Sequence, residues 1–227
     1  MNRIPSVLKM HYRDKTSWFI VPGMVLGSSF AVNLLVGALG AIEIYTGGLM
    51  SIYIYMFVMG ILVVPQTFPF AISFSVRRQD YYSGTALYAV TSGIVITLLL
   101  LLMSFLESDV TNNWGVDLHF FNLPYLSDGS IFQQFVIYLL VLLTTFFGGF
   151  TIGSFYRKFR NTGMLLLAIA SVFAVTVLSY FMTKNDWWMD VYEWLIDHTA
   201  FQLALWLIPI ILVCNLISFL FLRRSTV

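Results

Sequence analysis

The sequence predicts an all-α integral membrane protein with six transmembrane helices. Of its 227 residues, 59% are apolar and only 10% are charged, which is far fewer charges than a soluble domain of this size carries. The apolar residues fall in long blocks, and a helix needs about 20 such residues to cross a hydrocarbon core of about 30 Å. Six blocks of this length use nearly the whole chain. We therefore expect a single transmembrane domain over residues 1–227.

The predicted elements follow one another with short polar connections. Residues 1–17 are basic and carry apolar residues at helical spacing from Ile4 to Tyr12, which predicts a helix lying in the membrane interface. The six predicted spans cover residues 18–41, 49–76, 86–106, 131–155, 163–182 and 201–222.

Two of these spans contain residues that shape the helix backbone. Pro65 and Pro69 lie in the second span, and each proline removes a backbone donor, so we expect this helix to kink or break there. Gly149 and Gly153 lie near the end of the fourth span with a GxxxG spacing, which lets helix backbones approach closely. We expect these glycines to mediate helix packing.

Two connecting segments on the other side of the predicted membrane are acidic and aromatic. Residues 107–130 hold four acids and no Lys or Arg, so we expect them to lie against the outer headgroups. Residues 183–199 predict an amphipathic helix with tryptophans opposite an acidic face. The acidic face consists of Asp186, Asp190, Glu193 and Asp197.

The charges divide unequally between the two sides of the predicted membrane. Of the 12 Lys and Arg residues, 11 lie on the side of the two termini and only Lys184 lies on the other. Of the 11 Asp and Glu residues, 9 lie on the side opposite the termini. The positive-inside rule therefore predicts that both termini are cytoplasmic and that the chain is a multi-pass protein of the cytoplasmic membrane.

A short polar stretch separates the second and third predicted spans. We expect its arginines to hold the end of a span at the membrane surface, and Gly84 and Thr85 to break the chain and cap the next helix. Between them fits a short helix across the membrane face, with two adjacent tyrosines as anchors for a partner. An ordinary cytoplasmic loop is the alternative. The residues concerned are Arg77, Arg78, Asp80, Tyr81 and Tyr82.

The residues that carry chemistry disfavour several function classes. Every charged residue can be placed outside the apolar spans, whereas ion-coupled carriers usually keep an ionisable group inside the membrane. The sequence has no HExxH zinc pair and no phosphate-binding loop of the Gly-Lys-Ser/Thr type. Its single cysteine and three scattered histidines lack metal-ligand spacing. We therefore expect no catalytic residue, no metal and no cofactor in this chain, and no nucleic-acid partner.

Two stretches resemble a known transporter family. Residues 68–85 bring an apolar helix end to Arg-Arg, an aromatic residue and Gly-Thr, and residues 147–159 form a Gly-rich span end followed by aromatic and basic residues. Together with the order of the predicted spans, they resemble the permease subunit of small bacterial ABC exporters of the ABC-2 type. The sequence departs from the family pattern at Ser75-Val76, where a Gly-Val or Gly-Ala pair often precedes Arg-Arg.

The resemblance implies a division of labour between subunits. Such permeases work as dimers, alike or paired with a related chain, and a separate ATP-binding subunit holds ATP and Mg²⁺. The short helix over residues 77–83 would dock in that subunit, and the backbone at Pro65 and Pro69 would flex beside it. The many aromatic residues suit an apolar or amphipathic cargo, although headgroup belts and packing against lipid would explain most of them equally well. The acids of the two outer segments, 107–130 and 183–199, would suit a cationic peptide-like or drug-like cargo, unless acids simply accumulate outside because bases are held inside.

Other functions stay open at this point. A membrane-embedded binding subunit of a vitamin importer also has about six spans, although an Arg-Arg stretch between the second and third is unexpected for it. A membrane adaptor or immunity protein that binds a peptide or a kinase would use the same helices without transport. An intramembrane enzyme would need an ionisable pair that faces a cavity.

Overall fold

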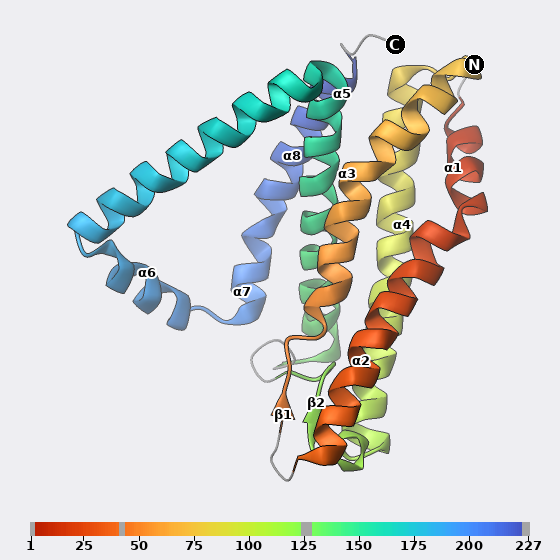
Figure 1. Cartoon of the computed structure of the whole chain (residues 1–227). Coiled ribbons are helices and arrows are strands. Elements are labelled where there is room, and N and C mark those ends of the chain that lie inside the picture. Colours follow the sequence, from red (N-terminus) through yellow and green to blue (C-terminus); the bar gives the residue numbers. More distant parts are fainter. Residues whose placement is uncertain (1–2, 41–43, 124–128, 224–227) are drawn as a thin grey trace.

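In the part of the chain that the structure describes, the protein is all-α apart from one pair of very short strands (Figure 1). The computed structural model describes residues 3–40, 44–123 and 129–223. Ala41, the predicted end of the first span, and Arg224 lie outside these residues. Within the described ranges, 5 helical segments are long and apolar enough to cross a membrane. They are Thr16–Leu39, Met50–Ser73, Arg78–Val110, Ile131–Lys184 and Ala200–Arg223.

The elements run in a simple order from the N-terminal helix to the C-terminal one. Strands β1 and β2 pair in parallel, with Ile44 opposite Leu118 and Tyr45 opposite His119. The bounds are α1 Ile4–Arg13, η1 Thr16–Ile20, α2 Val21–Leu39, β1 Ile44–Tyr45, α3 Met50–Ser73, α4 Arg78–Phe105, η2 Leu106–Val110, η3 Asn113–Gly115, β2 Leu118–His119, α5 Ile131–Lys184, α6 Trp187–Ile196, α7 Ala200–Leu205 and α8 Leu207–Arg223.

Helix α5 consists of two helices joined at a sharp bend. Its 54 residues include Arg160, whose backbone is not helical (φ 55°, ψ −155°). A straight helix of this length would measure about 80 Å, far more than one crossing needs. Figure 1 shows the first half rising to the end that carries both termini and the second half descending away from the body. The predicted spans 131–155 and 163–182 lie on either side of the bend, and six crossings stay a prediction.

The predicted break at Gly84 and the predicted break at the two prolines are both absent, and a kink at Pro65 and Pro69 stays a prediction. Helix α4 begins at Arg78 and runs without a break to Phe105, so residues 77–83 form no separate helix and the predicted cap at Gly84 and Thr85 is wrong. Helix α3 likewise continues through Pro65 and Pro69 without a break. In both places the packing partners, described below, hold a continuous helix that local sequence signals alone would interrupt.

Helices α3 and α5 approach each other backbone to backbone. A Cβ atom added to Gly149 would meet the carbonyl group of Phe57, and one added to Gly60 would meet the backbone of Phe146 and Phe150. Gly60 stands in no GxxxG pattern, so the sequence did not single it out. Without side chains at these points, the two helices gain the close contact that holds helices together in a membrane.

A proline takes part in the same contact. Pro65 has no backbone N–H, so the carbonyl of Ile61, four residues earlier, loses its usual helical donor. That carbonyl faces Gly153 of α5, where a Cβ atom would collide with it. A weak Cα–H···O contact is the interaction that such an approach permits. The proline and the glycine therefore belong to one interface, although 88 positions (153 − 65) separate them in the sequence.

The chain after α4 folds around the buried carboxylate of Glu107. Its oxygens accept hydrogen bonds from the indole N–H of Trp114 at 2.8 Å and from three successive backbone N–H groups. Those backbone donors belong to Phe120 at 3.1 Å, Phe121 at 2.9 Å and Asn122 at 2.8 Å. Phe120 and Phe121 are themselves buried and pack against Phe30 of α2. This part of the predicted headgroup-facing segment 107–130 is thus folded against the protein.

We expect Gly149→Ala to lower the free energy of unfolding by about 1–3 kcal/mol, because the methyl group would force α3 and α5 apart. The matched control is Gly148→Ala, where the added carbon would lie 3.8 Å from the Phe57 ring, an ordinary contact. The control should be neutral or slightly stabilising, because alanine favours a helix. Thermal unfolding of the purified protein in detergent measures both. Equal effects of the two substitutions would contradict the backbone contact.

We expect Glu107→Gln to destabilise the protein by at least about 1.5–3 kcal/mol, the cost of losing a hydrogen bond to a charged group. The amide group of glutamine would point its own N–H donors at the N–H groups that donate to Glu107 in the unmodified protein. Asp109→Asn is the control, because that carboxylate is exposed and bonded only locally, to the hydroxyl of Ser108 at 2.6 Å. Denaturant unfolding followed by tryptophan fluorescence would report on both. A Glu107→Gln variant as stable as Asp109→Asn would refute the organising role of Glu107.

Candidate functional site at the basic end

One end of the helix bundle gathers most of the basic residues. It carries the described chain ends, the turn from α3 to α4 and the bend of α5 (Figure 1). We call this region the basic end and define it by Arg3, Arg77, Arg78, Arg157, Lys158, Arg160 and Arg223. The strands lie at the opposite end (Figure 1), and the Glu107 carboxylate lies beside them, because it accepts a hydrogen bond from the backbone N–H of Phe120, directly after β2.

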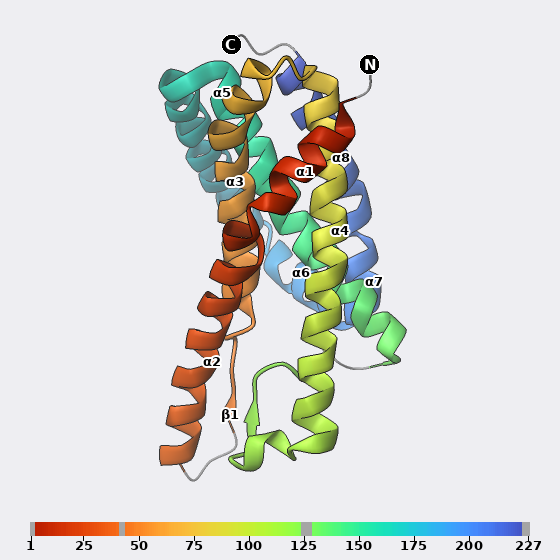
Figure 2. The ribbon, with the colours of Figure 1, turned by 90° about the vertical axis from the view of Figure 1, so that its right-hand side faces the viewer.

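Helix α1 is fastened to the start of α4. The backbone N–H of Arg3 donates to the Asp80 carboxylate at 3.1 Å, and the Arg3 guanidinium donates to the Phe74 carbonyl at 2.6 Å. Asp80 lies in the first turn of α4, where an acid also favours the helix dipole. A Cβ atom on Gly84 would collide with Val7, so Gly84 makes room for α1 and does not end a helix. Figure 2 shows α1 lying across α4.

His11 anchors the middle of this helix pair. Its ring is buried, is hydrogen bonded to the Thr85 hydroxyl at 3.0 Å and stacks on Tyr88, with 5.5 Å between ring centroids. The edge of Trp18 contacts the His11 ring as well. Burial lowers the pKa of His11 to about 4, against a smaller upward effect of the nearby Asp14 carboxylate. His11 is therefore neutral at physiological pH. The sequence did not identify this residue, because only tertiary packing buries it.

The two adjacent tyrosines bind helices of their own chain. Tyr81 is fully buried, and its hydroxyl lies 2.7 Å from that of Thr67 on α3. Tyr82 is partly buried and donates to the side-chain oxygen of Asn215 on α8 at 2.9 Å. The sequence predicted that Tyr81 would be available to a partner at the surface, but the side chain is buried. The exposed residues of the stretch are Arg77 and Gln79, while Arg78 is partly exposed and donates to the Arg223 carbonyl at 3.3 Å.

The turn between α3 and α4 ends the first helix with a residue in a left-handed conformation. Ser75 has φ 57°, and its N–H donates to the Ile72 carbonyl at 2.9 Å. The next N–H, of Val76, donates to the Ala71 carbonyl at 3.2 Å, and both Val76 and Ala71 are buried. This is the hydrogen-bond pattern of a helix end that favours glycine at the left-handed position.

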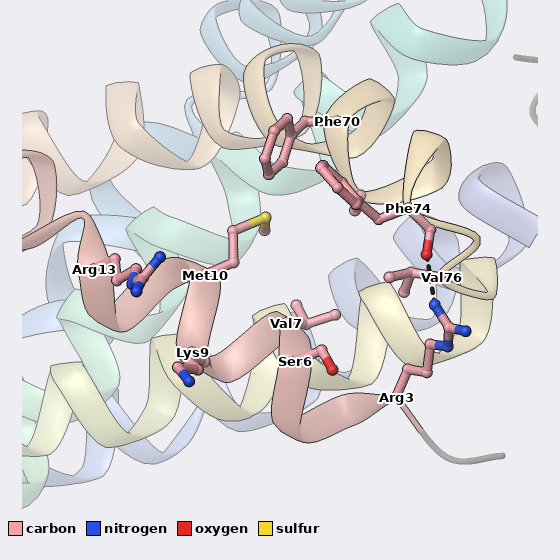
Figure 3. A pocket seen from close by; sticks show the side chains of 10 residues that line it. Arg3, Ser6, Val7, Lys9, Met10, Arg13, Phe70, Phe74 and Val76 are labelled. Carbon is pink, nitrogen blue, oxygen red and sulfur yellow. Dashed lines mark hydrogen bonds between the residues drawn. The ribbon is translucent and has the colours of Figure 1, made fainter.

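A groove of about 580 Å³ opens between α1 and the end of α3 (Figure 3). Its apolar surface comes from Met10 on α1 and from Phe70, Phe74 and Val76 near the α3–α4 turn. Its charged rim is wholly basic. The basic residues are Arg3, Lys9 and Arg13. The groove thus offers cations beside apolar surface next to exposed Arg77, a combination suited to an acidic or amphipathic partner.

The predicted outer acids lie on and beside helix α6, away from the basic end (Figure 1). Helix α6 forms within the predicted segment, and Asp186 and Asp197 flank it as cap residues. All four acids and the tryptophans of this helix are exposed. Of the four, Asp190 lines a shallow cavity of about 420 Å³ beside Trp187 and Trp194.

Comparison with family models, with curated proteins and with solved structures finds no match to this chain. Across the described residues, no group of three or more His, Cys, Asp or Glu side chains is placed to hold a metal ion.

We expect acid to weaken the docking of α1 through His11. The pKa of His11 is about 4 in the folded protein and about 6.5 when unfolded, so the unfolded chain binds more protons between these values. The stability from neutral His11 is complete above pH 6.5 and is lost as the pH falls toward 4. At pH 5 the loss is about 2 kcal/mol.

The measurement is the unfolding free energy from pH 7.5 to 5 for the unmodified protein and for His11→Gln. Glutamine keeps a polar partner for Thr85 but does not titrate, so its pH dependence should be flatter by the His11 contribution. Parallel pH profiles of the two proteins would exclude His11 as the source.

Proposed function

We propose that this chain is the permease subunit of an ATP-driven exporter of the ABC-2 type, energised through its basic end by a separate ATP-binding subunit. The observation that carries the proposal is the convergence of helices on the first two turns of α4. Asp80 holds α1, Tyr81 holds α3 and Tyr82 holds α8. A force applied to this junction would move four helices together, as a rigid-body switch requires.

The contact surface for the ATP-binding subunit would be the exposed side of this junction. Arg77 and Gln79 face away from the protein, and the groove of Figure 3 continues the surface along α1. Cations beside apolar side chains suit a partner that presents acidic and aromatic residues. In this proposal Tyr81 and Tyr82 transmit force inside the chain, and Arg77 meets the partner. ATP and Mg²⁺ would be bound by that partner.

The placement of charge supports an external energy source. In the described parts of the long helices, Asp, Glu, Lys and Arg lie only near the ends and at the α5 bend. Glu107 is already surrounded by hydrogen-bond donors, and His11 is neutral and buried. A carrier driven by protons or sodium needs an ionisable group within the membrane, whereas a carrier driven by a bound motor does not.

The second permease and the cargo follow from the same proposal. The second half of α5 and all of α6 expose apolar side chains that lipid or a second permease would cover. A pathway between two permeases, alike or related, would accept an apolar, amphipathic or peptide-like cargo. The exposed acids Asp186, Asp190, Glu193 and Asp197 would favour a cationic cargo at the outer mouth.

The test is purification of the C-terminally tagged chain from its native membranes, with mass spectrometry and an ATPase assay on the eluate. We expect an ATP-binding subunit to co-purify. Arg77→Glu should weaken its retention by about tenfold or more, because a charge reversal opposes the acidic partner. Lys184→Glu, an equal charge change on an exposed residue near α6, should leave retention unchanged.

Two outcomes would refute the proposal. A chain that purifies without any ATPase would point to a membrane adaptor or immunity protein that does not transport. Retention lowered equally by Arg77→Glu and Lys184→Glu would show that the basic end is not the contact surface.

A further inference from the structure

The bend of α5 encloses a second cavity at the basic end, separate from the groove of Figure 3. Its volume is about 690 Å³. The first half of α5 and the start of the second half both line it, and Pro65 of α3 closes one side. The polar residues that line it are Arg157, Lys158, Arg160, Asn161 and Thr162.

Among the described residues, the charged side chains that line this cavity are all basic. Three cationic side chains line it within four consecutive positions, and no acidic side chain of the described residues does. The Arg157 guanidinium lies over the buried Phe68 ring, 5.5 Å from its centroid, and its Nε–H is buried without a hydrogen-bond acceptor within the described structure. A buried donor on a charged group without an acceptor is costly, so an anion bound beside Arg157 would satisfy it.

The backbone adds to the positive potential. The second half of α5 begins directly after Arg160, and its first residues, Asn161 and Thr162, line the cavity. The positive end of that helix dipole therefore lies at the cavity, where it favours an anion. Arg157 and Lys158 approach from the first half, so one anion would contact both halves of α5.

The surroundings fit the phosphate of a lipid. Apolar side chains continue from the cavity along the second half of α5, with Leu165, Leu166 and Ile169 each about three-fifths exposed. Further along lies a shallow apolar hollow of about 460 Å³ that Ile169 and Phe173 help to line. An anionic phospholipid matches this arrangement of a basic cavity beside an apolar surface. Its phosphate would enter the cavity and its acyl chains would cover the exposed helix.

We propose that the cavity at the α5 bend binds the phosphate of an anionic phospholipid, which joins the two halves of α5 to the end of α3. Arg157 supplies the fork of donors that suits a phosphate, and Lys158 and Arg160 supply charge. The lipid site does not depend on the proposed exporter function, because the residues that line the cavity would attract an anionic lipid whether or not the chain transports a cargo.

The test uses the purified full-length protein in detergent, with phosphatidylglycerol or phosphatidylcholine added at equal concentration. Native mass spectrometry counts retained lipid, and thermal unfolding measures stabilisation. We expect phosphatidylglycerol, and not phosphatidylcholine, to be retained and to raise the unfolding temperature by several degrees. The double variant Arg157→Gln/Lys158→Gln should weaken phosphatidylglycerol binding by about tenfold to thirtyfold.

The matched control is Lys15→Gln/Lys184→Gln, which removes two exposed charges that line neither the groove of Figure 3 nor the cavity at the α5 bend. It should bind phosphatidylglycerol like the unmodified protein. Loss of Arg157 could prevent folding, so a second double variant, Lys158→Gln/Arg160→Gln, keeps this residue. It should also weaken phosphatidylglycerol binding.

Three results would overturn the proposal. The first is equal retention of the two lipids. The second is equal weakening by the α5 pair and by the control pair Lys15 and Lys184, which would indicate attraction to basic charge in general. The third is equal stabilisation by inorganic phosphate alone, which would identify a site for a free anion and not for a lipid.

Discussion

The close backbone contact between α3 and α5 is the constraint on which the rest of the structure depends. In a membrane, apolar side chains gain little from leaving lipid, so helices associate through close packing and polar contacts. Gly60, Gly149 and Gly153 let the two backbones meet, and Pro65 leaves a carbonyl facing one of these glycines. Helices α4, α7 and α8 then pack around α5. A side chain at Gly60, Gly149 or Gly153 would push α3 and α5 apart, and α4, α7 and α8 would lose the position of the helix against which they pack.

Buried polar groups fix the two ends of this bundle. At one end, Glu107 gathers backbone donors and the Trp114 indole, so irregular chain folds back onto α2. At the other end, Asp80 and the hydroxyl groups of Tyr81 and Tyr82 gather α1, α3 and α8 around the start of α4. In both places the hydrogen bonds are at least partly buried, so a missing partner would be costly.

The function we propose and the lipid site we infer use different parts of the basic end. In the proposed function the junction around α4 would transmit motion between helices, whereas the bend of α5 carries a separate concentration of positive charge. The first half of α5 contacts α3, and the side chains of its second half are mostly exposed. The bend at Arg160 therefore separates a packed helix from a peripheral one.

The sequence by itself determined the all-α class, the approximate extent of the apolar helices and the separation of basic from acidic residues, because these follow from local composition and from the energy of charges in a membrane. It also singled out Gly149 and Gly153. It did not determine that α4 continues through Gly84, that Tyr81 is buried, or that Glu107 and His11 organise their surroundings. Each of these depends on partners between 7 and 77 positions away in the chain, as Glu107 with Trp114 and Gly84 with Val7 illustrate. Only the tertiary structure decides such contacts, because a glycine or an acid has the same local propensities whether its neighbour is water or another helix.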